Sequence, residues 1–351
     1  MRTAPTIPRA LPRPGIAALA LCVALLAAPA SEIVRGDDAP GAEGAKPAAA
    51  SGLVLGTPVP PASPSDAEKD VGLVSLEANA GTVAGLRSDG RVLVRTGAGE
   101  RIVAPPDDAG AFRVLAVAGD GVAVVVTTRG RLVLLEEGGA RILPLAVQRS
   151  AKPAAIPGST DVVLGSENGS IRRLVRRDAR PRLDDVVASG DEPVGALAAA
   201  ADRVVYARLD GVVLEVAFAG GAPRVLARPP HTVSDVRVVG TTAYALEGGA
   251  FAAVGEGPPR VKADGAPPAS PSPEARAVAV SRDGTLVALV VGDAIEVRRL
   301  ADGTRASTTA LAPRAPSALA FEDDGRTLLV ATSTDARPWR VPVEAKPAPA
   351  R

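Results

Sequence analysis

The sequence predicts an all-β fold, specifically a β-propeller of seven blades with about four antiparallel strands in each. Two observations predict this fold: a β-hairpin unit repeats at a nearly constant period, and the strands of each unit grade from wholly apolar to alternating. The composition agrees, because 46% of the 351 residues are hydrophobic and the 36 Gly and 33 Pro favour many turns over long helices.

The repeat is marked by paired turns. In three units the first turn is an Asp-Gly pair, at Asp120-Gly121, Asp283-Gly284 and Asp324-Gly325. This pair favours tight hairpins because both residues tolerate positive φ. The second turn recurs, and from Asp89 to Asp335 its six intervals average about 41 residues, a length typical of propeller blades. The second turns are Asp89-Gly90, Arg129-Gly130, Asn168-Gly169, Asp210-Gly211, Gly248-Gly249, Gly292-Asp293 and Asp335-Ala336.

The strands between these turns differ in pattern. Second strands are continuously apolar, as from Val122 to Val126 and from Leu286 to Val291, whereas third strands alternate, as from Ile295 to Arg298. Continuous apolar strands are buried on both faces and alternating strands are half exposed. The gradient predicts blades packed face to face, with outer strands in solvent. A β-sandwich is the alternative fold, but it does not demand a constant period.

The ring has a candidate closing strand. The last unit ends near Val343, and only a Pro/Ala-rich tail follows, predicted to be disordered over residues 345–351. The apolar run Leu53 to Leu55, within residues 52–56, could add a fourth strand and cover the open sheet edge. Pro338 and Pro342 count against this hypothesis, since each removes a hydrogen-bond donor. The propeller itself is predicted to span residues 71–344.

Residues 1–30 have the pattern of an export signal. Arg2, Arg9 and Arg13 precede the apolar run Ile16 to Ala28, and small residues then predict cleavage after Ala30. An uncleaved anchor is the alternative, although 13 apolar residues are few for a membrane span. We therefore expect a periplasmic or extracellular protein with no stable membrane span after cleavage. Residues 31–70 are rich in Pro, Ala and Gly and form a predicted linker.

The composition excludes several chemistries. The only cysteine, Cys22, lies within the predicted signal, so the mature chain can form neither disulfides nor thiolate metal sites. A single histidine, His231, excludes histidine-cluster metal sites. The net charge is +1, or −2 after loss of three signal arginines, and aromatic residues are 2% of the chain, which argues against nucleic-acid binding. We expect no cofactor, no metal and no catalytic residue.

The densest charge feature is an arginine group in the third unit. It could attract an unknown protein or an acidic surface. Alternatively, it could protect a sheet edge against aggregation, as charged edge residues do. The group comprises Arg172, Arg173, Arg176, Arg177, Arg180 and Arg182.

The stretches Ala275 to Arg305 and Pro316 to Val343 resemble WD-repeat and related bacterial propeller repeats. The resemblance extends over roughly residues 71–343. The sequence from Leu300 to Gly303 stands where the family has Trp-Asp, and the family's structural histidine is absent. The resemblance implies a rigid interaction platform, usually without catalysis.

We therefore expect an exported, non-catalytic propeller that binds a protein or ligand in the cell envelope. The alternative is a lactonase-like or quinoprotein-like enzyme with its site in the central channel. The inner strands distinguish the two hypotheses. A channel lined by Ala and Val, as Ala196 to Ala201 and Ala277 to Val280 indicate, disfavours the enzyme, whereas converging acidic side chains favour it.

Overall fold

Every described residue belongs to one compact unit of the chain, residues 50–351. The computed structural model describes residues 53–345 except 64, 66–67, 150–151, 178–179, 255–274, 302, 304 and 312–313. The predicted export signal and most of the predicted linker lie outside the described residues. Among the described residues, no helix is long and apolar enough to cross a membrane.

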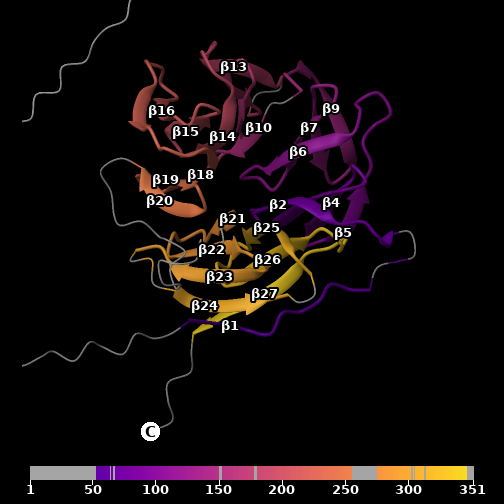
Figure 1. The fold of residues 1–351 in the computed structure, drawn as a ribbon. Helices are drawn as coiled ribbons and strands as arrows, with labels where there is room; N and C mark the ends of the chain where they lie inside the picture. The colour runs from indigo at the N-terminus through magenta and orange to yellow at the C-terminus, as the bar shows by residue number, and fades with distance from the viewer. Residues whose placement is uncertain are drawn as a thin grey trace, which may run out of the picture. The chain divides into compact units, whose positions relative to one another are not determined.

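The unit of residues 50–351 is a seven-bladed β-propeller, as predicted (Figure 1). Seven antiparallel sheets follow one another in a ring, and the inner strand of each lies beside the inner strands of its two neighbours. Blades 1 to 3 contain β2 (Leu73–Asn79), β3 (Thr82–Arg87), β4 (Val92–Thr96), β5 (Gly99–Val103), β6 (Phe112–Val117), β7 (Ala123–Thr127), β8 (Arg131–Glu136), β9 (Gly139–Ala146), β10 (Lys152–Ala155), β11 (Val162–Gly165), β12 (Ile171–Val175) and β13 (Arg182–Val187).

Blades 4 to 7 continue the same order from the channel outward. Blade 5 has three strands among the described residues, and the segment 255–274 that follows it is not described. These blades contain β14 (Val194–Ala199), β15 (Arg203–Arg208), β16 (Val213–Ala217), β17 (Arg224–Ala227), β18 (Val233–Val239), β19 (Thr242–Glu247), β20 (Ala250–Val254), β21 (Ala275–Val280), β22 (Leu286–Val291), β23 (Ala294–Arg299), β24 (Arg305–Ala310), β25 (Pro316–Phe321), β26 (Thr327–Thr332) and β27 (Trp339–Ala345).

The hydrophobic core is divided among the blade interfaces. Seven apolar clusters occur, and each joins side chains of two adjacent blades. The second strands supply both sides of these layers, and every residue of β7 and of β22 is buried. The continuous apolar pattern therefore arises because a second strand packs against a neighbouring blade on each face.

The turns follow the predicted chemistry. Gly121 and Gly284 have φ values of 78° and 68°, in the left-handed region that glycine adopts without strain. The preceding carboxylates also cap the turns, because Asp120 accepts a hydrogen bond from the Val122 amide at 3.2 Å and Asp283 from the Thr285 amide at 3.1 Å.

The prediction of a half-exposed third strand is wrong for β23. Glu296 and Arg298, the polar residues of its alternation, are 9% and 3% exposed. Burial is tolerated because the two side chains neutralise each other, with Arg298 Nη2 2.6 Å from Glu296 Oε2. An alternating pattern thus marked a buried ion pair at this position.

The closing-strand hypothesis is confirmed. Strand β1 (Leu53–Leu55) pairs antiparallel with β27 and becomes the outermost strand of blade 7. Pro342 is tolerated because its backbone faces the N-terminal segment, where its carbonyl accepts a hydrogen bond from Gly56 N at 2.8 Å. Its neighbour Val343 donates instead to Arg326 O, so pairing with β26 keeps its donors. Pro338 precedes β27 and interrupts no ladder.

Charged side chains reinforce the closure. Glu68, just ahead of blade 1, accepts hydrogen bonds from Arg87 of β3 at 3.0 Å and from Arg337, which precedes β27, at 2.9 Å. We call Glu68, Arg87 and Arg337 the closure cluster. Close backbone contact accompanies it, because a Cβ at Gly72 would collide with the Ser333 carbonyl. The first and last blades are therefore joined by backbone pairing, by close packing and by charge.

Candidate functional site

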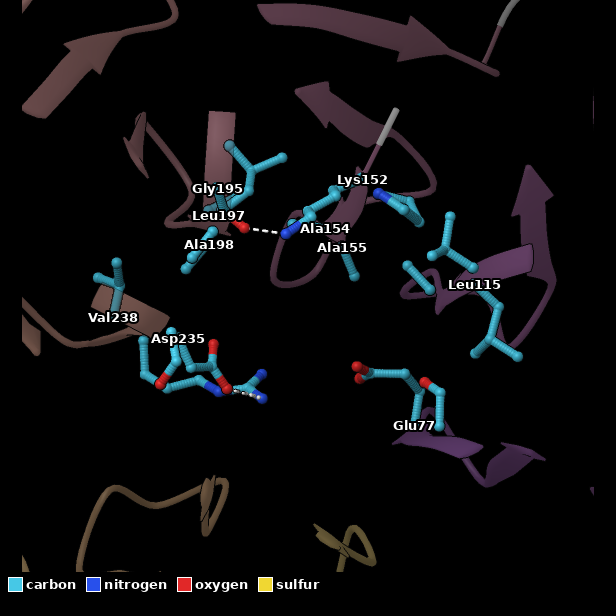
Figure 2. A pocket seen from close by; sticks show the side chains of 18 residues that line it. Glu77, Leu115, Lys152, Ala154, Ala155, Gly195, Leu197, Ala198, Asp235 and Val238 are labelled. Carbon is cyan, nitrogen blue, oxygen red and sulfur yellow. Dashed lines mark hydrogen bonds and ion pairs between the residues drawn. The ribbon is translucent and has the colours of Figure 1, made fainter. Parts of the chain in front are cut away.

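The central channel contains a cavity of about 440 Å³, lined by the inner strands of blades 1 to 5. Figure 2 shows the cavity with side chains from these strands around it. Its walls are mostly small or aliphatic, with Leu115, Ala154 and Leu197 among the lining residues. Cavities of this size accommodate small organic molecules.

The β-pairing defines equivalent positions on the seven inner strands. Residues at equivalent positions pair with the same position of the second strand in their own blade. For example, Lys152 of blade 3 pairs with Gly165 and Ser75 of blade 1 pairs with Leu86, and each partner lies four residues before the glycine of the following turn. The set that we call level 1 is Ser75, Val114, Lys152, Ala196, Asp235, Ala277 and Ala318, and level 2 is Glu77, Ala116, Ala154, Ala198, Arg237, Ala279 and Ala320.

Charge is confined to a few of these positions. Level 2 is alanine in five blades, and its other two members are Glu77 and Arg237. Level 1 likewise contains one base, Lys152, and one acid, Asp235. All four side chains line the same cavity. The channel wall therefore has two acids and two bases within an otherwise small and weakly polar surface.

Asp235 and Arg237 neutralise each other. Arg237 Nη2 lies 2.9 Å from Asp235 Oδ2, and it also donates to the Val278 carbonyl of blade 6 at 3.3 Å. The charge of Asp235 raises the pKa of Arg237, and Glu77 adds to this effect. Arg237 Nε is buried and has no hydrogen-bond partner among the described residues. The pair is thus a fixed, internally balanced element of the wall.

Glu77, unlike Asp235 and Arg237, has a carboxylate outside any ion pair of the described residues. Its side chain is partly exposed to the channel, and within the described residues no hydrogen bond or ion pair involves its carboxylate. Desolvation raises the pKa of Glu77, the nearby Arg237 opposes that rise and Asp235 reinforces it. Figure 2 shows the Glu77 carboxylate extending into the cavity from the blade 1 side, facing Asp235 across it.

Lys152 is the corresponding base. Its ammonium donates to the Gly195 carbonyl of blade 4, as the dashed line in Figure 2 shows, and no described carboxylate lies within ion-pair distance of it. Burial lowers the pKa of Lys152, Asp235 raises it and Arg113 lowers it further. The cavity thus contains one carboxylate, Glu77, and one ammonium, Lys152, that form no ion pair with the described residues, although Arg237 and Asp235 act on them from a greater distance.

The expected apolar channel is therefore found only in part. The alanines of β14 line the cavity as expected, but blades 1, 3 and 5 place charges in the wall. No cluster of three or more acidic, histidine or cysteine side chains able to hold a metal occurs in the described part of the chain. The sequence signal for these charges was available in Leu73 to Asn79 and Val233 to Val239, but it emerges only when all seven inner strands are aligned.

Most of the predicted arginine group is paired with acids. Arg172 contacts Asp185 at 3.0 Å, Arg173 contacts Asp161 at 2.7 Å and Arg182 contacts Asp184 at 3.0 Å, all within blade 3. Arg176 bridges to Asp120 of blade 2 at 3.0 Å. Arg177 donates to Ser159 Oγ at 3.0 Å, and Arg180 is exposed. The group is gathered on one blade, and its role in binding a partner stays a prediction.

The single histidine and the single tryptophan of the chain lie away from the channel cavity. His231 is exposed in the loop ahead of β18. Trp339 is partly buried against the core of blades 6 and 7, and its Nε1 donates to Asp335 at 2.7 Å. These contacts give Trp339 a packing role.

Comparisons with known proteins identify the fold. No protein-family model matches the chain, and no curated protein matches its sequence significantly. Among solved structures, the WD40 repeats of RRP9 superpose with a TM-score of 0.66 at 13% identity, covering 84% of this chain and 98% of that one.

Two further structures show the same likeness. U3-55K has a TM-score of 0.63 at 13% identity, covering 84% of this chain and 99% of that one. A streptogramin B lyase has 0.62 at 12% identity, covering 84% and 98%. At these identities the likeness concerns the fold alone: the chain folds as a WD40-like propeller, an architecture shared by the lyase and the WD40-repeat proteins.

Proposed function

We propose that this chain is an exported, non-catalytic binding propeller of the bacterial cell envelope, related to the WD-repeat propellers. The observation that carries the proposal is the channel wall, which presents two charged groups outside any ion pair of the described residues, Glu77 and Lys152, on a rigid, alanine-rich surface. Rigid and largely preformed cavities with a few polar groups are typical of ligand-binding sites. The predicted signal of residues 1–30 supports the envelope location.

Export is tested with the full chain. Expression in a bacterial host followed by fractionation and N-terminal sequencing should place the protein outside the cytoplasm, beginning at Ser31. A chain that stays cytoplasmic and begins at Met1 would contradict the location. An uncleaved, membrane-associated chain would instead favour the anchor interpretation.

Partner binding is tested by capture and by charge reversal. The protein is cross-linked in an envelope extract, and captured proteins are identified by mass spectrometry. Reversal of Arg177 and Arg180 to Glu leaves the four ion pairs of the arginine group intact, so loss of a dominant partner would place its contact on blade 3. Reversal of Arg91 and Arg131, exposed arginines of blades 1 and 2, is the matched control.

A second candidate function, catalysis in the channel, has one observation in its favour. Glu77 combines a raised pKa with access to a cavity, and this combination is typical of general acids and bases. A catalytic propeller would convert its ligand, whereas a binding propeller would release it unchanged. Monitoring a bound small molecule by NMR therefore separates the two functions.

A further inference from the structure

We infer that the channel cavity binds a small zwitterion, namely a short peptide with small apolar side chains, whose ammonium contacts Glu77 and whose carboxylate contacts Lys152. This inference rests on the proposed binding function and gives its ligand class. It follows from three features of the cavity: the two charges outside any ion pair of the described residues, their opposite sign, and the small side chains in the wall between them.

The charge balance selects a doubly charged, net-neutral ligand. Asp235 and Arg237 satisfy each other at 2.9 Å, so Glu77 and Lys152 are the charges in the wall that remain for a ligand. A ligand with only an ammonium would pair with Glu77 and leave Lys152 desolvated without a carboxylate. Burying an unpaired charge is costly. A zwitterion satisfies both groups and leaves the occupied cavity neutral.

The geometry places the two charges on different blades and levels. Glu77 is at level 2 of blade 1 and Lys152 is at level 1 of blade 3, with blade 2 between them. Figure 2 shows both side chains at the rim of the same open space. The ligand must therefore separate its ammonium from its carboxylate, as the two ends of a peptide do.

The cavity wall between Glu77 and Lys152 determines which side chains a peptide ligand can carry. Val114 and Ala116 of blade 2 lie between the two charged blades, and Leu197 and Ala198 complete the lining from blade 4. Aromatic side chains are missing among the lining residues of this cavity. Alanine-sized side chains suit this surface and the volume of about 440 Å³.

The test is isothermal titration of the purified protein with di- and trialanine. Each peptide is compared with its N-acetylated form, which lacks the ammonium, and its C-terminal amide, which lacks the carboxylate. We expect binding of at least one free peptide and a loss of about tenfold or more for either blocked form, because each block removes one charge-assisted hydrogen bond. No heat from either free peptide at millimolar concentration, or equal affinity for blocked and free forms, would overturn the inference.

Variants locate the site. Glu77→Gln and Lys152→Met should each lose about tenfold or more in affinity for the free peptide. Glu77→Gln should bind the N-acetylated form as well as the free form, a result that a merely structural role would not give. Glu137→Gln and Arg131→Gln change exposed residues of blade 2 and should bind as the parent does. Unchanged affinity in both channel variants would overturn the assignment.

The outcomes separate this inference from the proposed function. A peptide that binds and is cleaved, as seen by NMR, would contradict the non-catalytic function and leave the ligand class standing. A protein that captures an envelope partner but binds neither peptide would contradict only the ligand class. The blocked-peptide series uses the parent protein, so it remains decisive even where a channel variant fails to fold.

Discussion

The ring closure and the central channel both withdraw charged side chains from bulk water, but they treat these charges differently. At the closure, both oxygens of Glu68 accept hydrogen bonds from arginines, one of which, Arg87, has a side chain only 1% exposed. In the channel, Glu77 faces a cavity without such a partner. The two glutamates respond oppositely: arginine contacts lower the pKa of Glu68 to about 2, and desolvation raises that of Glu77.

This difference distinguishes structural charges from charges reserved for a ligand. A carboxylate that the fold requires is stabilised in its ionised form by the fold itself, and it contributes to stability. A carboxylate held without a partner costs stability, and such a cost is typical of functional sites. Substitutions that remove one charge at a time test this difference between the two regions.

The largest effect is expected at the closure. Glu68→Ala leaves Arg87 buried without one of its two carboxylates, and it should lower the free energy of unfolding by about 3 kcal/mol. Urea denaturation measures this change. Glu137→Ala, an exposed carboxylate in the β8–β9 turn, is the control and should change it by less than about 0.5 kcal/mol. Similar losses in the two variants would show that the closure cluster has no special role.

The closing strand should have the next largest effect. Leu55 is 8% exposed and packs into the core between blades 6 and 7, whereas Val54 of the same strand is 38% exposed. Leu55→Ala should lower the free energy of unfolding by about 2 kcal/mol and speed hydrogen exchange of β27, while Val54→Ala should do neither. Slow exchange of β27 in both variants would mean that β1 is dispensable for closure.

The smallest effect on stability is expected for Lys152. Its ammonium forms no ion pair with a described carboxylate, so Lys152→Met leaves no carboxylate without an ion-pair partner. We expect thermal denaturation to give a free energy of unfolding within about 0.5 kcal/mol of the parent. A loss as large as that of Glu68→Ala would place Lys152 with the structural charges and remove it from the ligand site.

The sequence predicted the ring and its closure because these depend on local rules. Glycine-containing hairpin turns and apolar second strands recur along the chain, and Leu53 to Leu55 is an apolar run ahead of the first blade. The tolerance of Pro342 could not be predicted, since it depends on which side of β27 each residue directs its backbone.

The channel charges escaped prediction for a related reason. In the sequence, Glu77 and Arg237 have the pattern of solvent-exposed polar residues in two alternating strands. Only the pairing register of each inner strand with its second strand shows that the equivalents of Glu77 and Arg237 in the other five blades are alanines. The arginine group, by contrast, is visible in the sequence, but its partners Asp120 and Asp161 become neighbours only through the pairing of strands and the packing of blades 2 and 3.

The most direct test of this account is the free energy of unfolding of Glu68→Gln and Glu77→Gln as a function of pH. The contribution of Glu68 is present above pH 4.5 and is lost as the pH falls towards its folded pKa of about 2, so Glu68→Gln should destabilise at pH 7 and flatten this acid limb. The penalty of ionised Glu77 is absent below pH 4.5 and grows as the pH rises through its raised pKa. Glu77→Gln should therefore stabilise the protein at pH 7 and leave it unchanged near pH 4. Destabilisation by both variants at pH 7 would contradict the distinction between the two regions.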